Sequence, residues 1–511
     1  MRTNLRSRQK TVQVALFAIS VLLLPLVRGA SQSNQFYWDE PKQITAIESH
    51  FPAVVSDGNT AYCFFEEVRA ASGGKSGGTL WIAMQTLAGL DWSAPKRITA
   101  GFPYSGDVPD CFSAAISGNT VALAVAASDT VVRVYVSKDA GRSFSEIALP
   151  ALEQAVVGPR LFVSHTGDFV LFASLGAREL ASNADQQNYE RFSFSLVAAT
   201  SHDGLTWSAF APFAPSSKLS NPFSPFLCPT SGGDLVVFQA QYEDSATSRL
   251  SNQLYASFSA DGAQWQPAAL LTDARSLPTS ATYRFEQYHN QRPFVYAFGS
   301  SLYLAWERTL YTLDSPDIWV AELSAQGALQ GGADQVTLQG GAHRPILFAF
   351  DNALSLLWFD NHRGSDSVFT AQKNGRFWDD KPLYVASSNS WARFAYPVLS
   401  QGKQELSFVW QTYDARRKQP RLYALQTDHS VQLPRITGVS FTAGKRSTAR
   451  KATARLVAPA DASGIAGFSW LWTQDSSAEP PEQLMNLADE TTISGTTMNH
   501  SWSFTARTWL T

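Results

Sequence analysis

The stretch SHFPAVVSDGNTAYCFFEEVR, residues 49–69, decides the fold, because it is the first of a series of similar segments. It contains a short apolar run, a turn built from Asp, Gly and Asn, and a second apolar run. Six later segments repeat this plan, so that the seven copies begin at Pro52, Ser113, Pro159, Pro225, Pro293, Pro345 and Pro397. An internal repeat of this kind indicates a solenoid, a propeller or another repeated architecture.

Each copy predicts two antiparallel strands joined by a tight turn. A third strand follows, as in TLWIAMQ (79–85), and a fourth opens with a Trp and a nearby Pro, as in DWSAPKRIT (91–99). Four antiparallel strands in each repeat are typical of a β-propeller, and no amphipathic helical pattern separates them. The sequence therefore predicts an all-β fold with a seven-bladed β-propeller over residues 36–430, with six blades as the alternative.

The two ends of the repeat array predict how the ring closes. The segment FYWDEPKQIT (36–45) nearly duplicates LDWSAPKRIT (90–99), so the chain begins with a fourth strand that lacks its first three. In a closed ring this strand completes the last blade. The segment LPRIT (433–437) competes for the same place, and we favour the N-terminal strand.

The two termini differ in character from the repeats. Residues 1–30 combine a basic start, an apolar run and small residues at 29–30, which predicts a cleaved secretory signal peptide; an uncleaved membrane anchor is the alternative. Residues 432–511 include APADASGIAGFSWLWT (458–473), which resembles part of an immunoglobulin- or fibronectin-like β-sandwich. The length predicts that this module is truncated.

Composition excludes several classes of function. The net charge is −3 and no basic run stands out, which argues against nucleic acid as a partner. The three cysteines, Cys63, Cys111 and Cys228, fall in apolar runs and are expected to be buried thiols, although a Cys63–Cys111 bridge is conceivable. No zinc-ligand spacing, phosphate loop or nucleophile elbow is present, so we expect neither a metal nor a cofactor.

Three turns between third and fourth strands carry the pattern Ser-x-Asp followed by Gly and an aromatic residue. They are SKDAGRSF (137–144), SHDGLTW (201–207) and SADGAQW (259–265). With these turns the chain resembles the sialidase-like β-propellers that contain Asp boxes, also called BNR repeats. The resemblance implies a structural role, away from the active face, for Ser137, Asp139, Gly141, Phe144, Ser201, Asp203, Trp207, Ser259, Asp261 and Trp265.

The resemblance also implies catalytic residues, and several of them are missing. Sialidases carry an Arg-Ile-Pro motif whose Arg grips the carboxylate of the sugar, but the aligned residues here are His50, Phe51 and Pro52. The acid/base Asp of the family is expected in the loop RAASGGKSGG (69–78), which contains no acid. If the chain is a divergent glycoside hydrolase, its catalytic candidates are Tyr283, Glu286, Tyr288, Arg292, Arg344 and Arg393.

The starts of first strands and the ends of second strands are expected to meet at the ligand-facing side of the ring. The binding candidates there are His50, Glu67, Arg69, Arg292, Trp306, Glu307, Arg308, Arg344, Trp358, Asp360, Arg363 and Arg393. Glu66, His289, His343, Tyr396 and His362 occupy similar positions, as do Asp110 and Trp391. A simpler alternative is that neighbours such as Glu307 and Arg308 only neutralise each other at the rim.

We therefore expect an exported, non-catalytic propeller that recognises a glycan or an envelope protein through this face. The alternative is the divergent sialidase-like hydrolase described above. The expected location is the periplasm, the cell surface or the medium, with a bacterial origin favoured and no membrane span after removal of the signal peptide.

Overall fold

The computed structural model of the 511-residue chain is all-β over its described part. The structure describes residues 37–38, 42–69, 77–86, 91–103, 112–128, 130–182, 188–244, 249–272, 288–310, 315–350, 352–362, 366–375, 377–379, 383–386, 392–399, 406–414, 419–428, 435–437, 451–457, 465–473, 490–496 and 503–510. The predicted signal peptide lies outside these residues. The chain divides into two compact units, of which one comprises residues 40–426.

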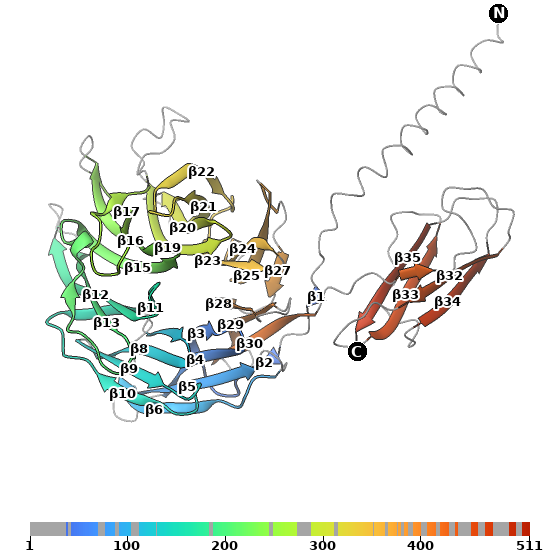
Figure 1. Cartoon of the computed structure of the whole chain (residues 1–511), viewed down its shortest axis with the longest axis horizontal. Coiled ribbons are helices and arrows are strands. Elements are labelled where there is room, and N and C mark those ends of the chain that lie inside the picture. Colours follow the sequence, from blue (N-terminus) through green and yellow to red (C-terminus); the bar gives the residue numbers. More distant parts are fainter. Residues whose placement is uncertain are drawn as a thin grey trace, which may run out of the picture. The chain divides into compact units, whose positions relative to one another are not determined.

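Seven sheets form the blades of a propeller in this unit, which confirms the predicted fold (Figure 1). Blade 1 has β3 (His50–Ser56), β4 (Thr60–Arg69), β5 (Gly77–Thr86) and β6 (Lys96–Pro103). Blade 2 has β7 (Phe112–Ser117), β8 (Thr120–Ser128), β9 (Val131–Ser137) and β10 (Ser145–Ala148). Blade 3 has β11 (Ala155–Val163), β12 (Phe169–Ser182), β13 (Asn188–Ser201) and β14 (Ala211–Pro212). A short 3-10 helix, η1 (Ala214–Ser216), precedes the fourth blade.

The remaining blades repeat the same antiparallel order. Blade 4 has β15 (Ser220–Thr230), β16 (Gly233–Asp244), β17 (Arg249–Ser259) and β18 (Ala269–Leu270); blade 5 has β19 (Tyr288–Phe298), β20 (Ser301–Leu310), β21 (Asp317–Leu323) and β22 (Leu329–Gln335). Blade 6 has β23 (Ala342–Phe350), β24 (Ala353–Asp360), β25 (Ser367–Asn374), β26 (Phe377–Trp378) and β27 (Leu383–Ala386); blade 7 has β28 (Ala392–Leu399), β29 (Leu406–Asp414) and β30 (Gln419–Asp428).

The N-terminal strand completes the seventh blade, as predicted. Strand β2 (Lys42–Gln43) pairs with β30, and β1 (Tyr37–Trp38) pairs with the last residues of β30. The backbone N–H of Ile44 also donates to the carbonyl of Leu422 at 2.8 Å. The competing segment forms β31 (Arg435–Thr437), which pairs with β32 (Lys451–Val457) instead. Segments far apart in the sequence therefore share the closing sheet of the ring.

Apolar side chains fill the space between neighbouring blades. On β4, for example, Tyr62 and Phe64 pack toward blade 2, whereas Cys63 and Phe65 pack toward blade 7. A strand buried on both faces needs apolar residues at successive positions rather than at alternate ones. This requirement explains the continuous apolar runs of the repeat.

The proline of the repeat marks a β-bulge in the innermost strand. In six of the seven blades the pairing with the second strand shifts at this point. A residue with positive φ sits in each bulge; these residues are Phe51, Gly158, Ser224, Arg292, Arg344 and Phe394. Five of them immediately precede a proline, whose missing N–H is tolerated where the ladder is interrupted.

The innermost strand of blade 2 is the exception. Its repeat begins with Ser113 instead of Pro, and β7 pairs with β8 in unbroken register from Phe112 to Ser117. Over these described residues no bulge interrupts the pairing.

The three turns that contain Ser, Asp and Gly share one hydrogen-bond pattern. In the first, Ser137 Oγ donates to Asp139 Oδ1 at 2.8 Å and accepts the N–H of Gly141 at 2.7 Å. Hydrogen bonds from the Ser143 side chain and backbone, among others, lower the pKa of Asp139 to about 2. The equivalent turns at Ser201 and Ser259 form the same bond from Ser to Asp.

The described cysteines are free thiols. Cys63 and Cys228 are both buried and unbridged, so the conceivable Cys63–Cys111 disulfide is not formed. Burial raises the pKa of the Cys228 thiol to about 12 and that of Cys63 further still. Both side chains fill core space, as expected.

The C-terminal part contains two further sheets. One comprises β31, β32 and β34 (Glu490–Thr496), and the other comprises β33 (Ile465–Thr473) and β35 (Ser503–Leu510). The immunoglobulin-like assignment of this part stays a prediction. No helix among the described residues has the length and hydropathy needed to cross a membrane.

Candidate functional site

A cavity of about 250 Å³ opens where the innermost strands of blades 2 to 7 converge. Its polar lining comprises Ser113, Arg160, Ser224, Arg292, Arg344 and Tyr396. Its aromatic lining comprises Phe162, Phe226, Phe294, Trp358, Phe359 and Phe394. Four of the six positive-φ residues are in this lining. The bulges of blades 4 to 7 therefore each place one side chain in the wall of the cavity.

Holding non-glycine residues at positive φ is unfavourable by about 1–2 kcal/mol each. Ser224, Arg292, Arg344 and Phe394 have φ values of 51, 51, 54 and 51°. Strained backbone of this kind clusters at functional sites. Its concentration around one cavity marks that cavity as the candidate site.

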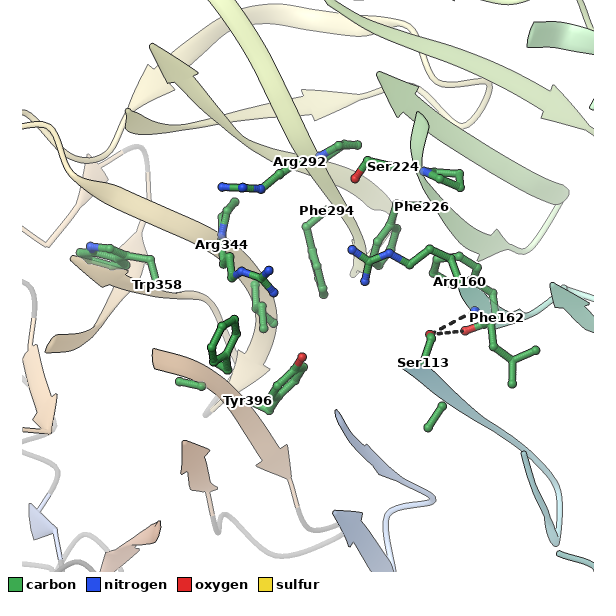
Figure 2. A pocket seen from close by; sticks show the side chains of 18 of the residues that line it. Ser113, Arg160, Phe162, Ser224, Phe226, Arg292, Phe294, Arg344, Trp358 and Tyr396 are labelled. Atoms are coloured by element: carbon green, nitrogen blue, oxygen red, sulfur yellow. Dashed lines mark hydrogen bonds between the residues drawn. The ribbon is translucent and has the colours of Figure 1, made fainter. Parts of the chain in front are cut away.

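Three arginines from three blades line the cavity. Arg160 lies on β11, Arg292 on β19 and Arg344 on β23. In Figure 2 the side chains of Arg160 and Arg344 extend toward the middle of the cavity from opposite sides. The Arg344 guanidinium also lies over the Phe394 ring, 4.7 Å from its centre. Planar guanidinium groups suit a carboxylate, sulfate or phosphate.

Glu307 on β20 lies beside the cavity lining and forms an ion pair with Arg292, one of these three arginines. Its carboxylate is 0% exposed, and Arg292 Nη1 donates to both of its oxygens at 3.0 Å. The backbone N–H of Arg344 donates to Oε1 at 2.8 Å, and Gln291 Nε2 donates to Oε2 at 3.4 Å. His343 Nδ1 lies 3.5 Å from Oε2.

These contacts keep Glu307 ionised. Burial by itself raises the pKa of a carboxyl, but the opposing effects are larger. The His343 side chain, the charge of Arg292 and the Arg344 N–H together lower the pKa of Glu307 to about 2. One full negative charge is thus buried beside the arginines.

Glu66 occupies the same place in blade 1 but has a different environment. It lies opposite His50, just before the bulge residue Phe51, as Glu307 lies opposite Gln291 before Arg292. The side chain is 0% exposed, and neither carboxyl oxygen has a hydrogen-bond partner. Burial raises its pKa to about 8, so the carboxyl is mostly protonated at neutral pH.

Glu66 differs from Glu307 in what the innermost strand of the next blade offers to its carboxyl. On β4, Glu66 follows the alternation of Tyr62 and Phe64 and faces blade 2. Glu307 receives the N–H of a bulge residue in the following blade, but β7 of blade 2 has no bulge in its described register. The buried carboxyl of Glu66 accordingly has no hydrogen-bond donor from the described residues of blade 2.

Some of the residues predicted from the sequence meet at the cavity. Arg292, Arg344, Trp358 and Tyr396 line it together, and Glu307 lies directly behind Arg292. The ion pair of Glu307 is formed with Arg292 on the neighbouring strand. The Arg308 guanidinium stacks on Tyr288 and Trp319, 4.1 and 4.9 Å from the ring centres.

Other predicted residues serve the blades and do not line the cavity. His50 Nε2 bonds Glu48 at 2.8 Å, and Glu67 accepts a hydrogen bond from Trp81 Nε1 at 3.0 Å. The buried Trp306 donates from Nε1 to Asn290 at 2.7 Å.

Further predicted residues are held locally or lie outside the described part. Asp360 accepts the backbone N–H of His362 at 2.8 Å and pairs with the His362 ring. Outside the described residues or side chains are Arg69, Asp110, Tyr283, Glu286, Arg363, Trp391 and Arg393.

Sequence reasoning missed Arg160. In blades 5 and 6 the arginine precedes the proline of the repeat, whereas Arg160 follows Pro159. Its bulge contains Gly158 as the positive-φ residue, so the arginine sits two positions further along the strand. An arginine within two residues of the repeat proline, on either side, would have been the signal.

Comparisons with known proteins concern the fold. No protein-family profile and no curated protein sequence matches the chain. Among solved structures, an ulvan lyase from a polysaccharide lyase family aligns with a TM-score of 0.51 at 10% identity, over 76% of this chain and 95% of that one.

Two other structures align less well. A protein of unknown function from Dyadobacter fermentans gives a TM-score of 0.44 at 11% identity, over 77% of this chain and 99% of that chain. A mutant sialidase of Trypanosoma rangeli gives 0.38 at 10% identity, over 79% and 59%. At these identities the likeness is one of fold, a propeller that glycan-active enzymes also use.

Proposed function

We propose that the chain is an exported propeller that binds a carboxylate-bearing glycan in the arginine-lined cavity without cleaving it. The observation that carries this proposal is the convergence of Arg160, Arg292 and Arg344 from three blades on one aromatic-walled cavity. Aromatic rings offer flat apolar faces for a sugar ring, and guanidinium groups offer a fork for its carboxylate.

The size of the cavity favours a small part of a glycan. A volume of about 250 Å³ is at the lower end of ligand pockets, which span roughly 300–1,000 Å³. A single acidic sugar unit fits this space better than a long oligosaccharide. The remaining sugar units of the glycan would lie outside the cavity.

The test compares two sugars that differ at C6, where D-glucuronate carries a carboxylate and D-glucose a hydroxymethyl group. D-glucuronate is expected to bind the purified protein at least about tenfold more tightly than D-glucose, because charge-assisted hydrogen bonds contribute roughly 1.5–3 kcal/mol each. Titration calorimetry measures both, with galacturonate and N-acetylneuraminate as further carboxylated sugars. Equal affinity for charged and neutral sugars, or no binding of any carboxylated sugar, would refute the proposal.

Tyr396 supports a second candidate, a divergent glycoside hydrolase. Its side chain lines the same cavity as the arginines, where a phenol can act as a nucleophile or transfer a proton. Turnover of sialylated or other aryl glycosides that Tyr396→Phe abolishes would favour this candidate over simple binding.

A further inference from the structure

The bulge residues differ in size around the ring. Blades 3 and 4 have the smallest, Gly158 and Ser224, and the other four bulges contain Phe51, Arg292, Arg344 and Phe394. Because the cavity suits a single acidic sugar unit, the next unit of a bound glycan has to pass one of these bulges. The small side chains of blades 3 and 4 hinder that unit least.

Strand β15 of blade 4 contains a second bulge. Its pairing with β16 shifts between Ser220 and Phe223 and again between Phe223 and Phe226. Asn221 and Ser224, each directly before a proline, have φ values of 51 and 50°. The other six innermost strands, over their described residues, have one such shift or none. Two strained residues so close together mark this strand as a candidate for a functional role.

Hydrogen bonds hold the second bulge in place. Asn221 Oδ1 accepts the backbone N–H of Phe194 on β13 at 3.0 Å, and Asn221 Nδ2 donates to Gln241 Oε1 on β16 at 3.0 Å. Phe223 lies between the two bulges and packs against the Phe194 ring, with the ring centres 5.1 Å apart and the planes at 31°. The second bulge therefore places Phe223 against blade 3, next in the chain to the cavity residue Ser224.

Val157 on β11 extends this aromatic pair toward blade 3. Gly176 on β12 leaves room for both, because a Cβ atom there would lie 2.7 Å from the Phe194 ring and 3.1 Å from Val157 Cγ2. Val157 is 41% exposed, and Phe194 and Phe223 are half-buried. These three uncharged side chains form an apolar platform that reaches solvent beside the two smallest bulge residues.

We propose that the apolar platform is a second subsite, which binds the uncharged sugar unit next to the acidic unit in the cavity. This inference rests on the proposed function and names the next part of its ligand. The C–H face of a pyranose ring is apolar, so packing it on Phe223 and Val157 removes apolar surface from water. The ligand is thus a glycan in which an acidic sugar is bonded to a neutral one.

The first experiment compares D-glucuronate with two disaccharides, in which glucuronate is linked β-1,3 or β-1,4 to D-glucose. Titration calorimetry of the native protein is expected to show about tenfold tighter binding of the better disaccharide than of D-glucuronate. In Phe223→Ala this ratio of affinities should fall to about two or less, because the ring that packs on the neutral sugar is removed. The matched control is Phe377→Ala, which truncates a 76% exposed ring on blade 6 and should keep the tenfold ratio.

Two milder variants keep the test decisive if Phe223→Ala does not fold. Phe223→Leu retains an apolar side chain against Phe194 but lacks the flat ring, and most of the gain from the second sugar should be lost. Val157→Ser changes an exposed side chain and should lower the ratio about two- to threefold. Thermal unfolding of each variant shows whether the propeller is folded.

The outcomes separate this inference from the proposed function. If D-glucuronate binds but neither disaccharide binds more tightly, the subsite is refuted and the proposed function stands. A tenfold ratio that survives in folded Phe223→Leu and Val157→Ser has the same meaning. If no carboxylated sugar binds at all, the proposed function is refuted and the subsite with it.

Discussion

Replacing Arg160 and Arg344 together by glutamine is expected to weaken binding of D-glucuronate at least about a hundredfold. The two guanidinium groups extend into the cavity from opposite sides (Figure 2). Each charge-assisted hydrogen bond to a carboxylate contributes roughly 1.5–3 kcal/mol, so the loss of two such groups amounts to about 3–6 kcal/mol. Each single variant should lose about tenfold or more.

Glutamine is the appropriate replacement, because it removes the charge and keeps much of the length. At Arg344 it also leaves an L-residue at a φ of 54°, as in the native chain, so the backbone strain is not altered. The control is Arg133→Gln, which removes one positive charge, as each single variant does, on the third strand of blade 2. Calorimetry should show native affinity in this control. Native affinity in the double variant would mean that the anion is held elsewhere.

The second large effect concerns the protonated Glu66. Thermal stability of the propeller is expected to fall as the pH rises from about 5 to 8, and Glu66→Gln should remove most of this fall. The native pKa is about 8, whereas the ordinary value is 4.5. Between these values the folded protein retains a proton that the unfolded chain has released, so stability decreases with rising pH.

The size of the effect follows from the displaced pKa. Each pH unit between the two values corresponds to about 1.4 kcal/mol, so the native protein loses several kcal/mol across the window. Below pH 4.5 the carboxyl is protonated in both states and the two proteins should respond alike to pH. Midpoints of thermal unfolding from pH 4 to 9 measure the difference.

The matched control for Glu66 is Glu146→Gln. Glu146 is 41% exposed, so this variant changes a surface glutamate in the same way, and the fall in stability between pH 5 and 8 should persist in it. Identical pH profiles of native protein and Glu66→Gln would show that the carboxyl is ionised and has a partner in solution.

Much of the fold could be predicted from the sequence, because the signals are local and repeated. The apolar runs around Pro52 and its counterparts predicted paired strands, and the duplicated segment 36–45 predicted the closing strand of blade 7. The proline itself was assigned to the start of a regular strand. It marks a bulge instead, since a residue without an N–H is accommodated where the ladder breaks.

Much less of the site could be predicted. Arg292 and Glu307 were both candidates, but their pairing depends on the register of β19 against β20, which shifts between Gln291 and Phe294. From the sequence alone, Glu307 and Arg308 looked like partners because they are adjacent in the chain. Arg160 was missed because the bulge of blade 3 has a different composition from those of blades 5 and 6.

Residue type and spacing along the chain were enough to predict the seven repeats, the pairs of strands within them and the closure of the ring, because these signals act locally. The side chains that line the cavity could be found only in the folded protein, because positive-φ bulges turn single residues out of the regular alternation of a strand. The tertiary structure also decided the charge of two glutamates at equivalent positions. An arginine and a backbone N–H lower the pKa of Glu307, whereas burial without a hydrogen-bond partner raises that of Glu66.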